Sequence, residues 1–190
     1  MENNSYARYR KGEKGDIMHD NSMKIMAEFA EEYDVKGTVV DIGSYDINGT
    51  YKSLFPNSKY IGVDTNPGPN VDVIIDSPEW DKLKNVDVVI SGQTLEHVAD
   101  IPKLMTSIFN VLKVGGIACI IAPSAGEAHY YPIWTGNVSK EQMMKHFQDA
   151  GFEVISCTIS EVGPFLDNCC IGKKPEVKVK AKRKGDDEDQ

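Results

Sequence analysis

Short apolar runs alternate with polar turns and helical segments through most of the chain, and this alternation is the strongest constraint on its fold. Strands separated by helices pair in parallel through right-handed crossovers. Near-continuous apolar strands belong to a sheet that is covered on both faces. We therefore expect an α/β fold, a doubly wound and mostly parallel seven-stranded sheet with helices on both faces. The predicted strands cover residues 38–42, 60–63, 71–75, 86–90, 117–122, 152–160 and 168–172.

Most segments between these strands are predicted to be helices, either from apolar residues at helical spacing or from residue types that are typical of helix ends. We expect Gly115 and Gly116 to cap the helix before the fifth strand. Only a loop containing Gly163 and Pro164 joins the last two strands, so they should form an antiparallel hairpin at one edge of the sheet. The predicted helices cover residues 16–33, 47–55, 79–83, 98–112 and 139–150.

The length of the chain suits one domain with short appendages. Residues 1–36 form an N-terminal segment and helix, which could close over the site as a lid or pack on the sheet as an ordinary helix. Residues 37–174 form the main domain. The charged segment 175–190 lacks aromatic residues and is typical of a disordered tail.

Charge and hydropathy limit the partners. The net charge is -8 and the pI about 5.0, and an acidic surface repels a phosphate backbone, so we expect no nucleic-acid partner. No apolar run approaches the roughly 20 residues that cross a bilayer, and the polar N-terminus lacks the core of a secretory signal. We expect a cytoplasmic protein without membrane contact, and include a homodimer among its expected assemblies.

The four cysteines show neither a paired-thiol motif nor the spacing of a zinc site. Two of them lie inside apolar runs, where thiols behave as small hydrophobes. We expect reduced, structural cysteines and no metal. The cysteines are Cys119, Cys157, Cys169 and Cys170.

The loop after the first predicted strand is the first place to look for a ligand, because such sheets bind ligands at the carboxyl ends of their strands. Its glycines, Gly43 and Gly49, are widely spaced, with Asp46 between them. A dinucleotide fingerprint has three close glycines that seat a pyrophosphate, and a carboxylate in the loop would repel that group. The loop suits a ligand with an ammonium and a sulfonium better.

The next two predicted strands also end in carboxylates. Asp64 closes the second strand, where it can accept hydrogen bonds from both hydroxyls of a ribose. Asp76 and Ser77 close the third strand and could meet an adenine amino group. A strand-terminal Asp alone is often a turn former. Three strand-terminal aspartates in register, counting Asp41 of the first strand, favour a nucleoside site.

With these segments in their order and spacing, the sequence resembles the class I, Rossmann-like methyltransferases, particularly their type 11 branch, from about residue 39 to residue 155. The resemblance implies a fold of this class, S-adenosylmethionine as cofactor and S-adenosylhomocysteine as product. The segments that carry it are Val39-Val40-Asp41-Ile42-Gly43, Tyr60-Ile61-Gly62-Val63-Asp64, Asp87-Val88-Val89-Ile90-Ser91, Leu95-Glu96-His97, Val111-Leu112-Lys113-Val114-Gly115-Gly116 and Ala150-Gly151-Phe152.

The resemblance also implies a cofactor site, with the first loop at the methionine end and Asp64 at the ribose. Asp76 and Ser77 would lie at the adenine, and Gln93 near the methyl donor. Tyr45 replaces a glycine of the family's common loop, where it could narrow the methionine pocket or stack beside the sulfonium. The implied cofactor residues are Asp41, Gly43, Ser44, Tyr45, Gly49, Asp64, Thr65, Asp76, Ser77 and Gln93.

Methyl transfer is an in-line displacement, so holding the two reacting atoms collinear supplies most of the catalysis. A hydroxyl acceptor would benefit from a base, for which His97 and His129 are the first candidates, although His97 could equally be a packing residue. Segment 124–134 could form the acceptor wall or only anchor its own loop. Its aromatic residues, with His19, are the candidate substrate residues: Tyr130, Tyr131, Trp134 and His19.

Three functions compete. The first is a metal-independent methyltransferase for a small-molecule acceptor with a hydroxyl, since the sequence lacks the nucleobase-type Asn/Asp-Pro-Pro-aromatic run and the metal-binding Asp of catechol-type enzymes. The second is a protein that binds S-adenosylmethionine or S-adenosylhomocysteine without transfer, as a regulator or partner subunit. The third, a dehydrogenase-type Rossmann enzyme, ranks last because the dinucleotide fingerprint is absent.

Overall fold

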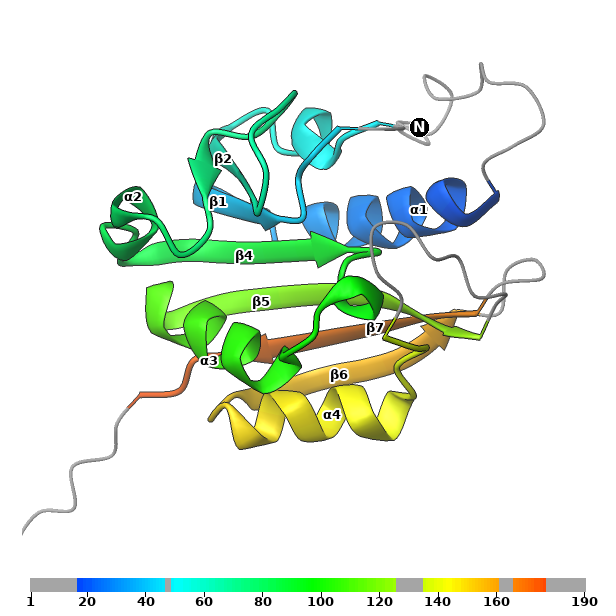
Figure 1. Cartoon of the computed structure of the whole chain (residues 1–190). Coiled ribbons are helices and arrows are strands. Elements are labelled where there is room, and N and C mark those ends of the chain that lie inside the picture. Colours follow the sequence, from blue (N-terminus) through cyan, green and yellow to red (C-terminus); the bar gives the residue numbers. More distant parts are fainter. Residues whose placement is uncertain (1–16, 47–48, 126–134, 161–165, 177–190) are drawn as a thin grey trace, which may run out of the picture.

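A single seven-stranded sheet forms the centre of the molecule (Figure 1), in a computed structural model that describes residues 17–46, 49–125, 135–160 and 166–176. The strand order is β3-β2-β1-β4-β5-β7-β6. The chain reverses direction across the sheet between β1 and β4, which makes this the switch point of the topology. The strands are β1 (Gly37–Ile42), β2 (Ser58–Asp64), β3 (Val73–Ile74), β4 (Val86–Gly92), β5 (Leu112–Ala125), β6 (Glu153–Ser160) and β7 (Leu166–Lys173).

The pairing confirms the predicted sheet. β1 pairs in parallel with β2 and with β4, and the parallel ladder continues to β3 on one side and to β5 on the other. β7 runs antiparallel to both β5 and β6, so the last two strands form the predicted antiparallel edge hairpin. The carboxyl ends of β1, β2 and β4 therefore lie together at one edge of the sheet.

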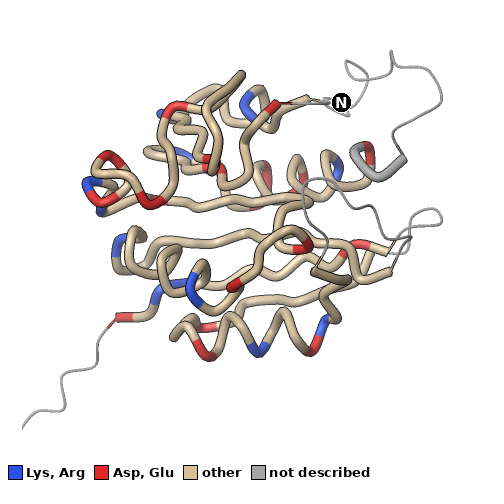
Figure 2. Tube along the Cα trace, in the orientation of Figure 1, with Lys and Arg blue, Asp and Glu red and all other residues tan. Residues whose placement is uncertain are grey.

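Helices cover both faces of this sheet (Figure 1). Met26 and Phe29 of α1 pack on one face with Val39 and Ile90, while Met105 of α3 and Phe147 of α4 pack on the other. Charged residues lie mainly on the helices and turns (Figure 2). None of the described helices is long and apolar enough to cross a membrane. The helices are α1 (Ile17–Glu32), α2 (Pro78–Asp81), α3 (Ile101–Val111) and α4 (Lys140–Asp149), with 3-10 turns η2 (Tyr51–Leu54) and η3 (Leu95–His97).

Two local predictions are wrong. The helix expected over 47–55 is, among its described residues, only the 3-10 turn η2, which Thr50 caps. Gly115 and Gly116 do not cap a helix, because α3 ends at Val111 and β5 begins at the next residue. The Gly115 N–H donates to the carbonyl of Lys174, just beyond β7, so pairing with the antiparallel strand extends β5 through the glycines.

Candidate functional site

The loop after β1 turns sharply at Gly43, whose φ of +81° lies in the left-handed region that glycine favours. The N–H groups of Gly43 and Ser44 both donate to the carbonyl of Val63, at 2.9 and 3.1 Å, which fixes the loop on the end of β2. A Cβ on Gly43 would overlap with the Thr94 side chain. The turn therefore brings the ends of β1, β2 and β4 into direct contact.

Asp41, the single acidic residue of β1, is buried and receives a hydrogen bond from the Tyr60 hydroxyl. The pKa of this carboxyl is raised from 3.8 to about 7, because burial raises it strongly, the Tyr60 hydrogen bond lowers it and the nearby charge of Asp64 raises it. Asp41 thus lies under the loop as a carboxyl that can hold a proton at neutral pH.

Replacing Asp41 with asparagine should change how stability depends on pH. The folded protein prefers the protonated carboxyl, so the stability present below pH 3.8 is lost as pH rises toward about 7. The loss amounts to about 4 kcal/mol for a shift of about three pKa units. Asp41→Asn should therefore be more stable than the wild type at pH 8, with a smaller difference at pH 5, in urea unfolding. An equal difference at both pH values would contradict this account of Asp41.

Asp64 ends β2 with a half-buried carboxylate that local donors hold in place. Its Oδ2 accepts from the N–H of Tyr45 at 3.3 Å, and its Oδ1 accepts from the N–H of Asn66 at 3.2 Å and the hydroxyl of Thr65 at 3.3 Å. The ring of Tyr45, 40% exposed, packs on Gly68, where a Cβ would overlap with it. Asp64, Thr65 and Tyr45 thus form one surface beside the loop after β1.

Asp46 and Gly49 shape the rest of that loop. The Asp46 carboxylate accepts from the Gly49 N–H at 2.8 Å, so it caps the turn. Gly49 has a φ of +124°, and the space where its Cβ would lie is open. The Ser44 hydroxyl donates to the carbonyl of Asn70 at 3.1 Å, which ties the loop to the segment after β2.

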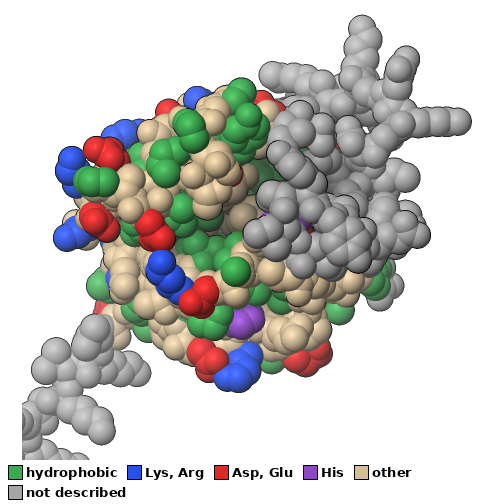
Figure 3. Space-filling model, in the orientation of Figure 1, with side chains coloured by type: hydrophobic (Ala, Val, Ile, Leu, Met, Phe, Trp, Pro, Cys, Tyr) green, Lys and Arg blue, Asp and Glu red, His purple; other side chains and the backbone are tan. Residues whose placement is uncertain are grey.

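Asp76 and Ser77 follow β3, as predicted, and both have partners within the chain. The Asp76 side chain is 61% exposed and pairs with Lys103 of α3 at 3.0 Å. The Ser77 hydroxyl accepts from the Trp80 N–H at 3.2 Å and caps α2. Figure 3 shows a hollow in this face of the molecule, with hydrophobic side chains along its floor.

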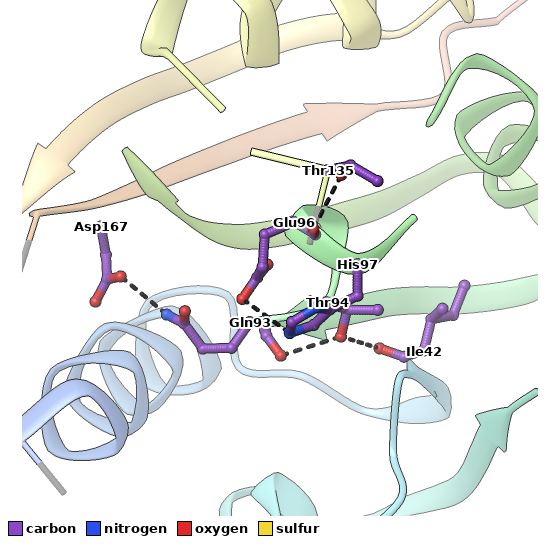
Figure 4. Close-up of polar contacts among 8 residues, drawn as sticks. Ile42, Gln93, Thr94, Glu96, His97, Thr135 and Asp167 are labelled. Atoms are coloured by element: carbon purple, nitrogen blue, oxygen red, sulfur yellow. Dashed lines mark hydrogen bonds and ion pairs between the residues drawn. The ribbon is translucent and has the colours of Figure 1, made fainter. Parts of the chain in front are cut away.

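Gln93, directly after β4, has a φ of +54°, which is uncommon for a residue with a side chain. Its amide nitrogen donates to Asp167 Oδ1 of β7 at 2.9 Å, while its amide oxygen is buried and has no hydrogen-bond partner among the described residues (Figure 4). Backbone strain of this kind is common at ligand sites.

Glu96 is a candidate that the sequence alone does not reveal, because glutamate side chains are usually exposed to solvent. Its side chain is completely buried, and neither carboxylate oxygen has a hydrogen-bond partner in the part of the chain that the structure describes. Oε1 lies 3.9 Å from His97 Nε2 (Figure 4). Burial, and to a smaller extent the charge of Asp167, raise the pKa of Glu96 from 4.5 to about 7, although the nearby backbone N–H of Glu96 acts in the opposite direction. Carboxyls with such a pKa often act as acids or bases.

A second feature missed from sequence is the network that joins α1 to the site. Asn21 Nδ2 donates to Asp167 Oδ2 at 2.6 Å, and the Ser160 hydroxyl donates to Asn21 Oδ1 at 2.9 Å. Asp167 therefore binds Asn21 on one oxygen and Gln93 on the other. The only sequence signal was the pair of polar residues, Asn21 and Ser22, within the predicted helix, and both are buried.

Several predicted site residues cannot be placed. His19 belongs to the first turn of α1, but its side chain is not among those described. Within the described residues, no group of three His, Cys, Asp or Glu side chains could hold a metal ion. The parts of the prediction that lie outside the described residues are the tail 177–190, the start of the N-terminal segment, and His129, Tyr130, Tyr131 and Trp134.

The sequence matches the methyltransferase domain family over residues 6–156, which is most of the chain, and the protein belongs to that family. It is an S-adenosylmethionine-dependent methyltransferase of class I, as the resemblance in the sequence implied. No curated protein matches it in sequence.

Solved structures share the fold at low sequence identity. One is the 1,6-didemethyltoxoflavin-N1-methyltransferase of Burkholderia thailandensis with bound 1,6-didemethyltoxoflavin and S-adenosylhomocysteine (TM-score 0.65, 14% identity, covering 82% of this chain and 79% of that one). Another is a SAM-dependent methyltransferase from Aquifex aeolicus (TM-score 0.56, 19% identity, 77% and 88% covered). The cyclase SpnF is also similar (TM-score 0.61, 14% identity, 80% and 80% covered). At these identities the likeness concerns the fold alone.

Proposed function

We propose that this methyltransferase acts, without a metal ion, on a hydroxyl of a small-molecule acceptor at the carboxyl ends of β1, β2 and β4. The observation that carries the proposal is the direct contact of these three strand ends at the switch point, where Gly43 packs against Thr94 and Tyr45 binds Asp64. Ligands of such sheets bind at this place. The structure of the Burkholderia enzyme, with its bound small molecule and S-adenosylhomocysteine, supports a small acceptor by analogy.

The residues present fit S-adenosylmethionine. The half-buried Asp64 carboxylate suits a pair of ribose hydroxyls, because carboxylate oxygens accept hydrogen bonds and local donors already fix its orientation. The space where a Cβ on Gly49 would lie is open. The bound cofactor supplies a methyl group activated by a sulfonium. The proposed cofactor residues remain Asp41, Gly43, Ser44, Tyr45, Gly49, Asp64, Thr65, Asp76, Ser77 and Gln93.

Within this site the chain positions the acceptor and removes its proton. Collinear placement of the acceptor oxygen and the methyl carbon accounts for most of the rate. From the sequence, His97 and His129 are the histidine candidates for assisting a hydroxyl acceptor. His97 lies beside the buried Glu96 carboxyl, so this part of η3 is where we place proton removal.

Incubation of the protein with methyl-labelled S-adenosylmethionine and a pooled small-molecule extract tests the proposal. The expected result is one labelled product, with label on oxygen and unchanged yield after treatment with EDTA. Tight binding of S-adenosylhomocysteine without any labelled product would favour the alternative, a cofactor-binding protein without transfer. Label on nitrogen or carbon would refute the hydroxyl acceptor, and loss of transfer in EDTA would refute metal independence.

A further inference from the structure

Three buried oxygen atoms near the end of β4 have no hydrogen-bond donor among the described residues: Gln93 Oε1 and both carboxylate oxygens of Glu96. An unpaired buried polar group costs about 1–3 kcal/mol, and more when it is charged, so folded proteins seldom keep one without a reason. All three atoms are acceptors. A ligand that donates two hydrogen bonds would satisfy Gln93 Oε1 and one oxygen of Glu96.

Asp167 fixes which end of the Gln93 amide faces the site. A carboxylate only accepts hydrogen bonds, so the amide nitrogen of Gln93 must face Asp167, at 2.9 Å, and the amide oxygen must point elsewhere. Asn21 Nδ2 donates to the other oxygen of Asp167 at 2.6 Å and holds this carboxylate in place. Asp167 is therefore a positioning residue that acts through Gln93.

Glu96 lies in the same region as Gln93, where the buried hydrogen-bond acceptor atoms gather. It follows Gln93 by three residues, and Figure 4 shows the two side chains on the segment that leads from β4 into η3. The charge of Asp167 acts on Glu96, and His97 Nε2 lies 3.9 Å from its Oε1. Among the described residues, neither Glu96 nor Asp167 forms an ion pair with a lysine or arginine. Anionic acceptors would be repelled here.

We propose that Glu96 is the base of the transfer and that Gln93 Oε1 accepts a second hydrogen bond from the methyl acceptor, which is a neutral molecule with a hydroxyl beside another hydrogen-bond donor. This inference rests on the proposed function and names its substrate class. The acceptor oxygen gives its proton to a Glu96 oxygen and forms the new bond to the methyl carbon, while the electron pair of the broken carbon–sulfur bond stays on sulfur. Charge balances, because one cation and one carboxylate become neutral.

Glu96→Gln is the test variant, because the amide has the same shape and cannot act as the base. Glu153→Gln, at the exposed start of β6, is the matched control. We expect Glu96→Gln to bind S-adenosylhomocysteine within about two-fold of the wild type and to slow labelled-product formation by at least about 100-fold. The control should change neither quantity. The wild-type rate should rise with pH through about 7, the pKa of Glu96, and this rise should vanish in Glu96→Gln.

Asp167→Asn tests the positioning residue. An asparagine at this place can also donate, so the Gln93 amide is free to turn over. The KM for the acceptor should rise several-fold, with a smaller change in kcat. A loss confined to kcat would contradict the role given to Gln93.

Other outcomes overturn the proposal. Transfer by Glu96→Gln at the wild-type rate would show that Glu96 is not the base. Weaker binding of S-adenosylhomocysteine, with unchanged binding of 5′-methylthioadenosine, would mean that these oxygens hold the cofactor's ammonium group. If the wild type binds S-adenosylhomocysteine and labels nothing, transfer itself fails, and this proposal fails with it.

Discussion

Asp64→Ala is expected to lower the affinity for S-adenosylhomocysteine by at least about 100-fold. The substitution removes a carboxylate that, on our account, accepts hydrogen bonds from two ribose hydroxyls, and a hydrogen bond to a charged group contributes about 1.5–3 kcal/mol. Two such bonds together exceed the roughly 2.7 kcal/mol that corresponds to a hundred-fold change. Isothermal titration calorimetry measures this directly.

Two variants control for indirect effects of the Asp64 substitution. Asp149→Ala removes an exposed carboxylate at the end of α4. Because this residue precedes the start of β6, it lies at the edge of the sheet opposite the proposed cofactor site. The affinity should therefore be unchanged. Asp64→Asn keeps one acceptor oxygen for the Tyr45 N–H and should give an intermediate loss. Unchanged affinity in Asp64→Ala would show that the ribose does not bind Asp64.

Gly43→Ala is expected to destabilise the protein by about 3 kcal/mol. An L-residue at a φ of +81° costs roughly 1–2 kcal/mol, and the new Cβ would also overlap with the Thr94 side chain. The loop must then move away from the end of β4, so S-adenosylhomocysteine should bind far more weakly. Urea unfolding gives the stability, and calorimetry gives the binding.

Gly49→Ala separates backbone strain from the overlap. Gly49 also has a positive φ, of +124°, but nothing lies within 4 Å of the position of its Cβ. This variant should therefore lose less stability than Gly43→Ala. Adding Thr94→Ala to Gly43→Ala should restore part of the loss. If Gly43→Ala and Gly49→Ala were equally stable, contact with Thr94 would not constrain the loop.

The sheet was predictable because strands buried on both faces carry apolar runs that stand out from the turns between them. The absence of a helical segment between the last two strands likewise predicted the antiparallel pairing of β7. The helix predicted over 47–55 was wrong, because so few apolar residues do not distinguish a helix from the 3-10 turn that its described residues form. The glycines after α3 were misread because local spacing does not reveal that β7 pairs with β5 beyond them.

The positions of some candidate site residues were predictable from their place along the chain. Asp64 is the last residue of β2 and Asp76 lies two residues after β3, and parallel topology brings such residues to one edge of the sheet. The hydrogen bond between Gln93 and Asp167 could not be predicted from the sequence, because Gln93, directly after β4, and Asp167 of β7 are far apart along the chain. The burial of Glu96 was also hidden, since a glutamate beside a histidine is usually a solvent-exposed residue.

Calorimetric titration of S-adenosylhomocysteine and of NADH into the purified protein tests the central claim most directly. The claim is that the strand ends around Gly43 and Asp64 form a site for S-adenosylmethionine and its product. It predicts saturable binding of one S-adenosylhomocysteine per chain, lost in Asp64→Ala, and no binding of NADH. Binding of NADH alone, or S-adenosylhomocysteine binding that Asp64→Ala leaves intact, would contradict it.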